Sequence, residues 1–193
     1  MRWFMKAMHV KPYTLFGFSL SKRLAFTAVF AALCAVSTLV VVIPLPTGYF
    51  NTGDVFVLLA GWCLGPLYGG VAAGVGSAVA DIISGFAIYA PVTFFIKGAV
   101  AVTAYCLFVL FRKWIKREPL AFLAHSFSAL IGEAVMVLGY FAYESVLYGL
   151  GGAFAAILGN TLQGVCCTVL ATIIVSLLRS VRRVREIFPT LKG

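Results

Sequence analysis

Long apolar runs separated by three groups of basic residues are the feature that most constrains what this chain can fold into. All but one of its fifteen Lys and Arg residues fall in these groups, and the exception is Lys97. Basic groups placed between apolar spans are typical of a membrane protein whose basic segments stay on the cytoplasmic side. The groups are Arg2, Lys6, Lys11, Lys22 and Arg23; Arg112, Lys113, Lys116 and Arg117; and Arg179, Arg182, Arg183, Arg185 and Lys192.

The composition indicates the same class of protein. Of the 193 residues, 62% are hydrophobic and 11% are charged, whereas an ordinary soluble domain is about 25% charged. The apolar segments are long runs and not ten-residue alternations, which favours helices over a β-barrel. A net charge of +9 would suggest a nucleic-acid partner in a soluble protein, but here its grouping indicates topology. We therefore expect an all-α integral membrane protein with no nucleic-acid partner.

The apolar runs predict six transmembrane helices with both termini cytoplasmic. The run at 55–64 would form only about 15 Å of helix, which is short for a span. It is counted as a crossing because an even number of crossings must separate two cytoplasmic basic groups. We expect this short second helix either to be extended by part of the neighbouring turn or to be surrounded by protein where it is too short. The predicted spans are 24–43, 55–64, 67–84, 91–111, 120–147 and 153–178. Gly65 and Pro66 are expected to break the chain between the second and third spans, and residues 148–152 to form an outer turn between the last two.

One domain is expected over the whole chain, 1–193. Residues 1–21 form a basic, aromatic cytoplasmic tail, either lying at the headgroup level or disordered. The six-helix body covers 22–180, and a second basic tail covers 181–193. Pro44 and Pro46 are expected to end the first helix, followed by a polar loop over 44–54.

Polar residues inside the apolar body converge on the outer half of the predicted spans. Ionisable groups at this depth cost several kcal/mol each unless they are paired or solvated, so they are functional candidates. We expect one outward-facing pocket in which Tyr140 and Tyr143 stack on a flat ring. Its predicted polar residues are Asp54, Asp81, Lys97, Glu133, Asn160 and Gln163.

A purely structural role for some of these charges is the competing interpretation. Lys97 could form a buried pair with Asp81 or with Glu133 and hold helices together. With Glu144, which shares a helix face with Glu133, four acids stand against one lysine and leave more carboxylates than one such pair explains. The excess favours a ligand rich in hydrogen-bond donors, or a cation, over a free carboxylic acid.

The sequence shows no chemistry of catalysis, metal binding or cofactor binding. It contains no GxxxxGK[ST], HExxH or GxSxG motif. Its five cysteines all lie in apolar runs without a CxxC motif, where small packing residues are expected. We therefore expect no metal, no cofactor and no enzyme activity.

The stretch from residue 51 to residue 98 resembles one family of transport proteins. It fits the pattern N-x-G-D, GP-x-x-G, G-S-A-x-A-D and YAP-x-TF-x-x-KG in that order. This pattern is similar to that of the substrate-binding S component of energy-coupling factor (ECF) vitamin transporters. Within that family the chain looks most like the group linked to hydroxymethylpyrimidine and pyridoxine. The resemblance extends over about residues 24–178.

The resemblance implies a protein of the prokaryotic plasma membrane that captures a small vitamin at the outer face. It implies association with a transmembrane coupling subunit and two ATPase subunits. The ligand would lie between the outer halves of helices four to six and the first loop, which adds Tyr49, Asn51 and Tyr89 to the expected site. An alanine-rich stripe on the first helix would dock the coupling subunit, here Ala25, Ala28, Ala32 and Ala35.

A different function remains open at this stage. The chain could be a self-sufficient proton-coupled carrier that uses Asp81, Lys97 and Glu133 as a relay. Such carriers usually show internal repeats or paired broken helices, and no convincing repeat is visible between the two halves of the sequence.

Overall fold

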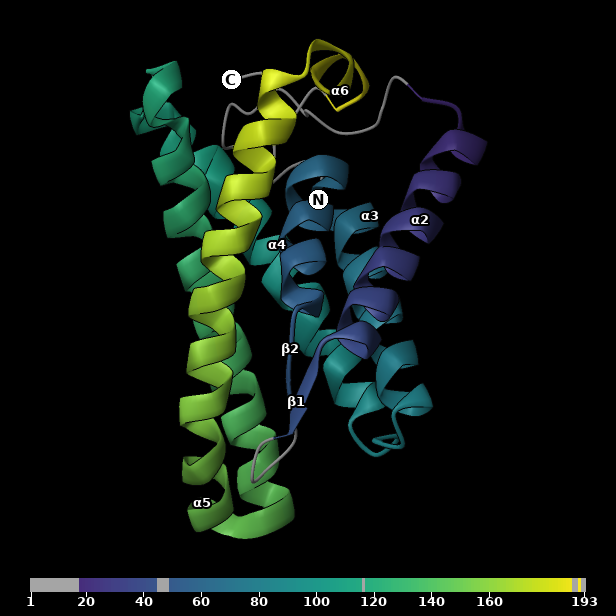
Figure 1. Ribbon diagram of the computed structural model, residues 1–193, viewed down its shortest axis with the longest axis vertical. Coiled ribbons are helices and arrows are strands. Elements are labelled where there is room, and N and C mark those ends of the chain that lie inside the picture. Colours follow the sequence, from purple (N-terminus) through teal and green to yellow (C-terminus); the bar gives the residue numbers. More distant parts are fainter. Residues whose placement is uncertain (1–17, 45–48, 116, 189–190, 192–193) are drawn as a thin grey trace, which may run out of the picture.

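The computed structural model describes residues 18–44, 49–115, 117–188 and 191 (Figure 1). The predicted N-terminal tail therefore lies outside the described residues up to residue 17, and so do residues 45–48 of the predicted polar loop over 44–54. Within the described ranges the chain is nearly all helical, as expected.

Four of the helices in the described part of the chain are long and apolar enough to cross a membrane. They are α2 (Leu20–Val40), α3 (Gly53–Ile83), α4 (Ala90–Trp114) and α5 (Ala121–Ser180). A short 3-10 turn, η2 (Glu118–Leu120), precedes α5, and α6 (Arg182–Ile187) follows it. The structure identifies these four helices by length and composition. The number of membrane crossings, six from the sequence, remains a prediction.

Helix α3 is broken at Gly65, where the sequence predicted a break at Gly65 and Pro66. Gly65 has φ +82° and ψ −178°, a conformation open essentially to glycine alone, and proline suits the first turn of the helix that resumes. The two halves fold back on each other, because a Cβ on Gly69 would meet the backbone of Ala60 and Gly61. The other glycines of the second half allow close contact with neighbouring helices, since a Cβ on Gly74 would meet Phe94 of α4 and one on Gly76 would meet Ala31 of α2.

Helix α5 is broken in the same way at Gly149, which has φ +76°. Gly164 on the second half lies against the side chain of Glu133 on the first, so α5 also doubles back, as Figure 1 shows. The break is sharper than the predicted turn over 148–152, since the helix resumes directly after Gly149.

The first half of α3 lies in the centre of the protein. Nearly every residue from Gly53 to Gly65 is buried. A Cβ on Gly61 would meet the backbone carbonyl of Ala101 on α4. Protein therefore surrounds this short segment, which agrees with the expectation that it is sheltered by protein.

The end of the first helix was predicted incorrectly. Helix α2 ends at Val40 and not at residue 43, and β1 (Val42–Pro44) pairs antiparallel with β2 (Tyr49–Asn51). Val42 and Ile43 are β-branched residues, which favour an extended backbone, and Pro44 stands at the end of its strand where no ladder hydrogen bond is needed. The region expected to be a polar loop thus contains a small hairpin.

Those members of the three basic groups that the structure describes gather at one end of the molecule. Figure 1 shows the start of α2 and helix α6 at the upper end, opposite the fold-back of α5. Glu118 pairs with Arg112 at 2.5 Å and with Arg179 at 2.6 Å. The central and C-terminal basic groups therefore lie together, as a common membrane side requires, although which side is cytoplasmic remains a prediction.

Candidate functional site

A polar pocket lies beside the β1–β2 hairpin, between α2, α3, α4 and both halves of α5. It contains about 550 Å³ of space between atoms, its open mouth included. The residues around it come from segments as distant in sequence as Thr38 and Gln163. They are Thr38, Tyr49, Asn51, Ser77, Asp81, Phe86, Tyr89, Thr93, Lys97, Tyr140, Glu144, Asn160 and Gln163.

Aromatic rings form a continuous wall of this pocket. The rings of Tyr49 and Phe86 have centroids 5.2 Å apart, and Phe86 lies 6.3 Å from Tyr89. Tyr89 in turn lies 6.4 Å from Tyr140. Separations of 4.5–7 Å between aromatic centroids are favourable contacts, so the wall is internally packed.

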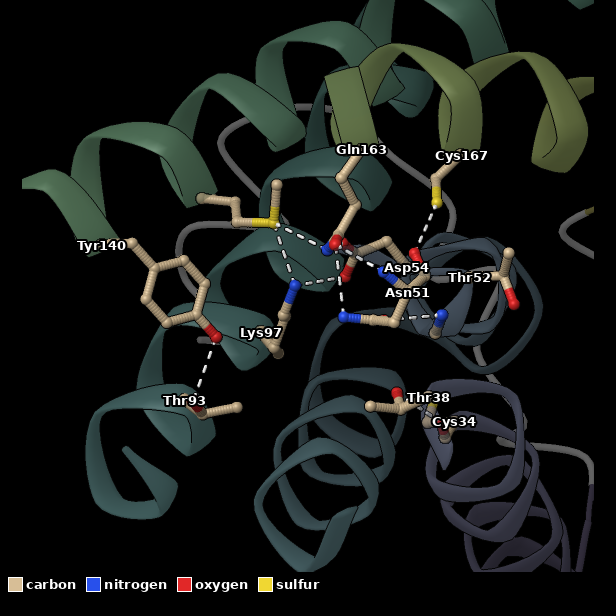
Figure 2. A network of polar contacts seen from close by, with 12 residues as sticks. Cys34, Thr38, Asn51, Thr52, Asp54, Thr93, Lys97, Tyr140, Gln163 and Cys167 are labelled. Atoms are coloured by element: carbon tan, nitrogen blue, oxygen red, sulfur yellow. Dashed lines mark hydrogen bonds and ion pairs between the residues drawn. The ribbon is translucent and has the colours of Figure 1, made fainter. Parts of the chain in front are cut away.

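A buried ion pair lies at the inner boundary of the pocket. Lys97 Nζ is 2.5 Å from Asp54 Oδ1, and the two side chains are 6% and 1% exposed (Figure 2). Lys97 also contacts Met136 Sδ at 2.9 Å and lies 5.5 Å from the ring centroid of Tyr140. The partner of Lys97 is therefore Asp54, and the predicted pairs with Asp81 or Glu133 are wrong.

Gln163 extends this ion pair to the hairpin. Its Nε2 donates to Asp54 Oδ2 at 2.5 Å, and its Oε1 accepts from the backbone N–H of Asn51 at 2.9 Å (Figure 2). The Asn51 side chain caps the start of α3, since its Oδ1 accepts from Gly53 N–H at 2.9 Å. One chain of hydrogen bonds thus joins α4, α3, α5 and β2, and it fixes the position of the hairpin.

Three buried oxygens of the pocket residues have no hydrogen-bond partner among the residues that the structure describes. They are Ser77 Oγ, Asp81 Oδ2 and Glu144 Oε2. The second oxygen of Asp81 accepts from Tyr49 at 2.9 Å, and that of Glu144 accepts from Tyr89 at 3.4 Å. Buried polar atoms are normally paired, so these three form a set of open positions, two of them acceptors on carboxyl groups.

Tyr49 links the hairpin to α3 through Asp81. The pKa of the Tyr49 phenol is raised, first by burial and then by the negative charge of Asp81. The phenol therefore stays protonated and can keep donating its hydrogen bond.

Eight of the predicted site residues line the pocket, and three do not. The eight are Tyr49, Asn51, Asp81, Tyr89, Lys97, Tyr140, Asn160 and Gln163. Asp54 is enclosed behind Lys97, and Tyr143 donates to the backbone carbonyl of Ile88 at 2.6 Å. Glu133 is 3% exposed, beside Gly164, and neither of its carboxyl oxygens has a partner among the described residues. Whether any of the eleven binds a ligand stays a prediction.

Five lining residues were absent from the predicted set: Thr38, Ser77, Phe86, Thr93 and Glu144. Two of them stand one helical turn before a predicted residue, Ser77 before Asp81 and Thr93 before Lys97, so the i,i+4 rule could have found them. Glu144 shares a helix face with Glu133. Thr38 and Phe86 gave no comparable signal.

The alanines predicted to meet a partner lie on the outside of α2. Ala25, Ala28 and Ala32 are exposed and Ala35 is half-buried. The contact of α2 with α3 uses another face, where Gly76 approaches the backbone of Ala31 and the Cβ of Cys34. The stripe is therefore left uncovered by the described part of the chain.

The described residues include no group of three or more His, Cys, Asp or Glu side chains that could hold a metal ion. The charged centre of the site is instead the Lys97–Asp54 pair.

Comparison with known proteins places this chain in a family. A curated protein of Pyrococcus woesei, described as "Uncharacterized protein in gap 3'region", is 39% identical over 132 residues, which cover 67% of this chain and 83% of that protein. A family model described as "ECF-type riboflavin transporter, S component" matches residues 19–180. The chain therefore belongs to the family of ECF-type riboflavin transporter S components, which are membrane proteins that bind substrates for vitamin uptake and are not enzymes.

Proposed function

We propose that this protein captures a small water-soluble vitamin, or a vitamin precursor, at the outer face of the plasma membrane. It then passes the molecule to a transmembrane coupling subunit that works with two ATPase subunits. In this arrangement the chain crosses the membrane six times, with Gly65 and Gly149 at two of the turns, and the basic end faces the cytoplasm.

The open oxygens of the pocket are the observation that carries this proposal. Ser77, Asp81 and Glu144 each present a buried oxygen without a partner among the described residues, beside a wall of four aromatic rings. A ligand with a flat ring and several hydrogen-bond donors would satisfy both features, because the ring stacks on the wall and the donors meet the oxygens. A carboxylic acid or a phosphate would meet two acidic side chains, which disfavours it.

The proposed substrate class is a heteroaromatic ring that carries amino or hydroxymethyl donors. Pyridoxine-like and hydroxymethylpyrimidine-like molecules fit this description. Riboflavin, which gives the matching family its name, has a larger flat ring and a chain of hydroxyl donors, so it is the second candidate.

The small molecule that copurifies with the protein tests this proposal. We expect mass spectrometry of the denatured, membrane-extracted protein to release a heteroaromatic compound with several donors. Titration calorimetry with pyridoxine, hydroxymethylpyrimidine and riboflavin then ranks the three. An acidic aliphatic compound in the pocket, or no binding of any of the three, would contradict the substrate class.

A self-sufficient proton-coupled carrier is not favoured by the family. Reconstitution separates the two functions. The protein alone, in vesicles with a pH gradient, should bind its substrate without accumulating it, and accumulation should require the coupling subunit, the ATPases and ATP.

A further inference from the structure

A second hollow lies at the basic end of the molecule, away from the pocket described above. It contains about 820 Å³ of space between atoms, its open mouth included. Its walls come from the η2 turn, from both ends of α5 and from α6. The charged, hydroxyl-bearing and aromatic residues of its lining are Glu118, Phe122, Ser176, Arg179, Ser180 and Arg185.

Positive charge exceeds negative charge in this hollow. Glu118 is shared by Arg179, which lines the hollow, and by Arg112, which lies behind it. The two arginine side chains are only 12% and 13% exposed, whereas that of Glu118 is 60% exposed. Arg185 makes no ion pair within the described ranges, and its charge repels that of Arg179. The lining of the hollow therefore holds two guanidinium groups, Arg179 and Arg185, and one carboxylate, Glu118.

The hydrogen-bond donors available in the hollow belong to arginine. The hydroxyls of Ser176 and Ser180 donate to carbonyls of their own helix, those of Thr172 and Leu177. One nitrogen of Arg179, Nη2, donates to Glu118 Oε2, and a guanidinium group has five N–H donors. Arginine presents these donors in a planar fork that matches the oxygens of a phosphate group.

Apolar side chains continue from the hollow onto the surface that the membrane covers. Phe122 lines the hollow and is 45% exposed, and Leu177, next to Ser176 in sequence, is 64% exposed. A basic hollow between membrane helices, bordered by apolar surface at headgroup depth, matches the arrangement in which anionic lipid headgroups bind.

We propose that this hollow binds a phosphate group through Arg179 and Arg185, supplied either by an anionic lipid headgroup or by free inorganic phosphate. A lipid would place its phosphate on the arginines and its chains along Phe122 and Leu177. This site is distinct from the vitamin pocket and does not depend on the proposed function.

Arg185→Gln tests the site with little risk to the fold, because Arg185 is exposed. Arg183→Gln is the matched control, since it removes the same charge from the same short helix. Arg183 is 90% exposed and lies 3.9 Å from Glu186, outside the hollow. Each full-length variant is reconstituted in nanodiscs of phosphatidylcholine or of an equal mixture with phosphatidylglycerol, extracted, and its retained lipid measured by native mass spectrometry.

We expect Arg185→Gln to reduce the retention of phosphatidylglycerol over phosphatidylcholine about fivefold, the effect of one arginine at a membrane surface. Arg183→Gln should leave the ratio unchanged, and Arg185→Lys should restore part of it. If inorganic phosphate raises the melting temperature of the wild-type protein but not of Arg185→Gln, with no lipid preference, the phosphate source is the free ion. Equal effects of Arg185→Gln and Arg183→Gln would overturn the site. The site would also be overturned if Arg185→Gln abolished assembly with the coupling subunit but left lipid and phosphate binding unchanged. That result would assign the hollow to a protein partner.

Discussion

The Nζ atom of Lys97 lies 2.5 Å from Oδ1 of Asp54, a residue 43 positions earlier in the chain. Both side chains are almost completely buried. The pair connects α4 to the first turn of α3, directly behind the polar pocket. Gln163 donates to Oδ2 of Asp54, so each oxygen of this buried carboxylate has a partner within the protein.

We expect Lys97→Met to lower the free energy of unfolding by about 3–5 kcal/mol, because removing one partner leaves an uncompensated buried charge. Thermal unfolding in detergent measures the effect. The double variant with Asp54→Asn should recover much of this loss, since no charge then remains. If Lys97→Met instead weakens ligand binding at an unchanged melting temperature, Lys97 acts as a ligand contact and not as a structural cation.

Gly76 should not tolerate even a methyl group. A Cβ at this position would overlap the backbone carbonyl of Ala31 on α2, so Gly76→Ala has to push two helices apart, at a cost of about 1–3 kcal/mol. Gly151→Ala is the control, because no atom lies within 4 Å of its Cβ and alanine favours the helix. Equal melting temperatures for the two variants would contradict the close packing of α2 on α3.

Much of this architecture could be predicted because it depends on local chemistry. The break at Gly65 followed from a Gly-Pro pair. Counting residues along helices placed Lys97 and Asp81 at similar levels, and both line the same pocket. The pairing of Lys97 could not be predicted, since helix periodicity gives a residue's depth and face but not the rotation of one helix against another. Asp54 is the first-turn acid of α3, and the sequence predicted only that it lies at the outer start of the second span.

The hairpin was missed for a related reason. Val42 and Ile43 suit both a membrane helix and a strand, and only the pairing with Tyr49–Asn51 decides between them. That pairing is stabilised from outside the segment, by the hydrogen bonds of Asn51 to Gln163, 112 positions away. Contacts of this range leave no periodic signal in the sequence.

We expect Asp81→Asn to weaken vitamin binding by about 1.5–3 kcal/mol, the contribution of a hydrogen bond to a charged group. The substitution keeps the shape and an acceptor for Tyr49 but removes the charge that a donor-rich ligand would meet. Titration calorimetry measures the affinity, and Ser145→Ala, outside the pocket, is the control. An unchanged affinity for Asp81→Asn would mean that the ligand does not reach Asp81 Oδ2.

The six-span topology predicts opposite labelling of two exposed positions. In a background without native cysteines, Gly151→Cys near the fold-back of α5 should react with a membrane-impermeant maleimide from outside intact cells. Arg183→Cys on α6 should react only after permeabilisation. Thr47 is a further expected outer position, but it lies outside the described residues. The reverse pattern would place the basic end outside the cell.

The alanine stripe of α2 is expected to contact the coupling subunit and not lipid. Small residues let two helices approach closely, and Ala32 is exposed in the middle of this stripe. Ala32→Trp should therefore abolish ATP-dependent uptake by the reconstituted transporter, while the isolated protein keeps its vitamin affinity. Leu33→Trp is the control, because Leu33 is 38% exposed, points about 100° away from Ala32 around the same helix, and should retain uptake. If Ala32→Trp lowers binding and uptake together, the stripe supports the fold of this chain; if both tryptophan variants keep full uptake, the coupling subunit docks elsewhere.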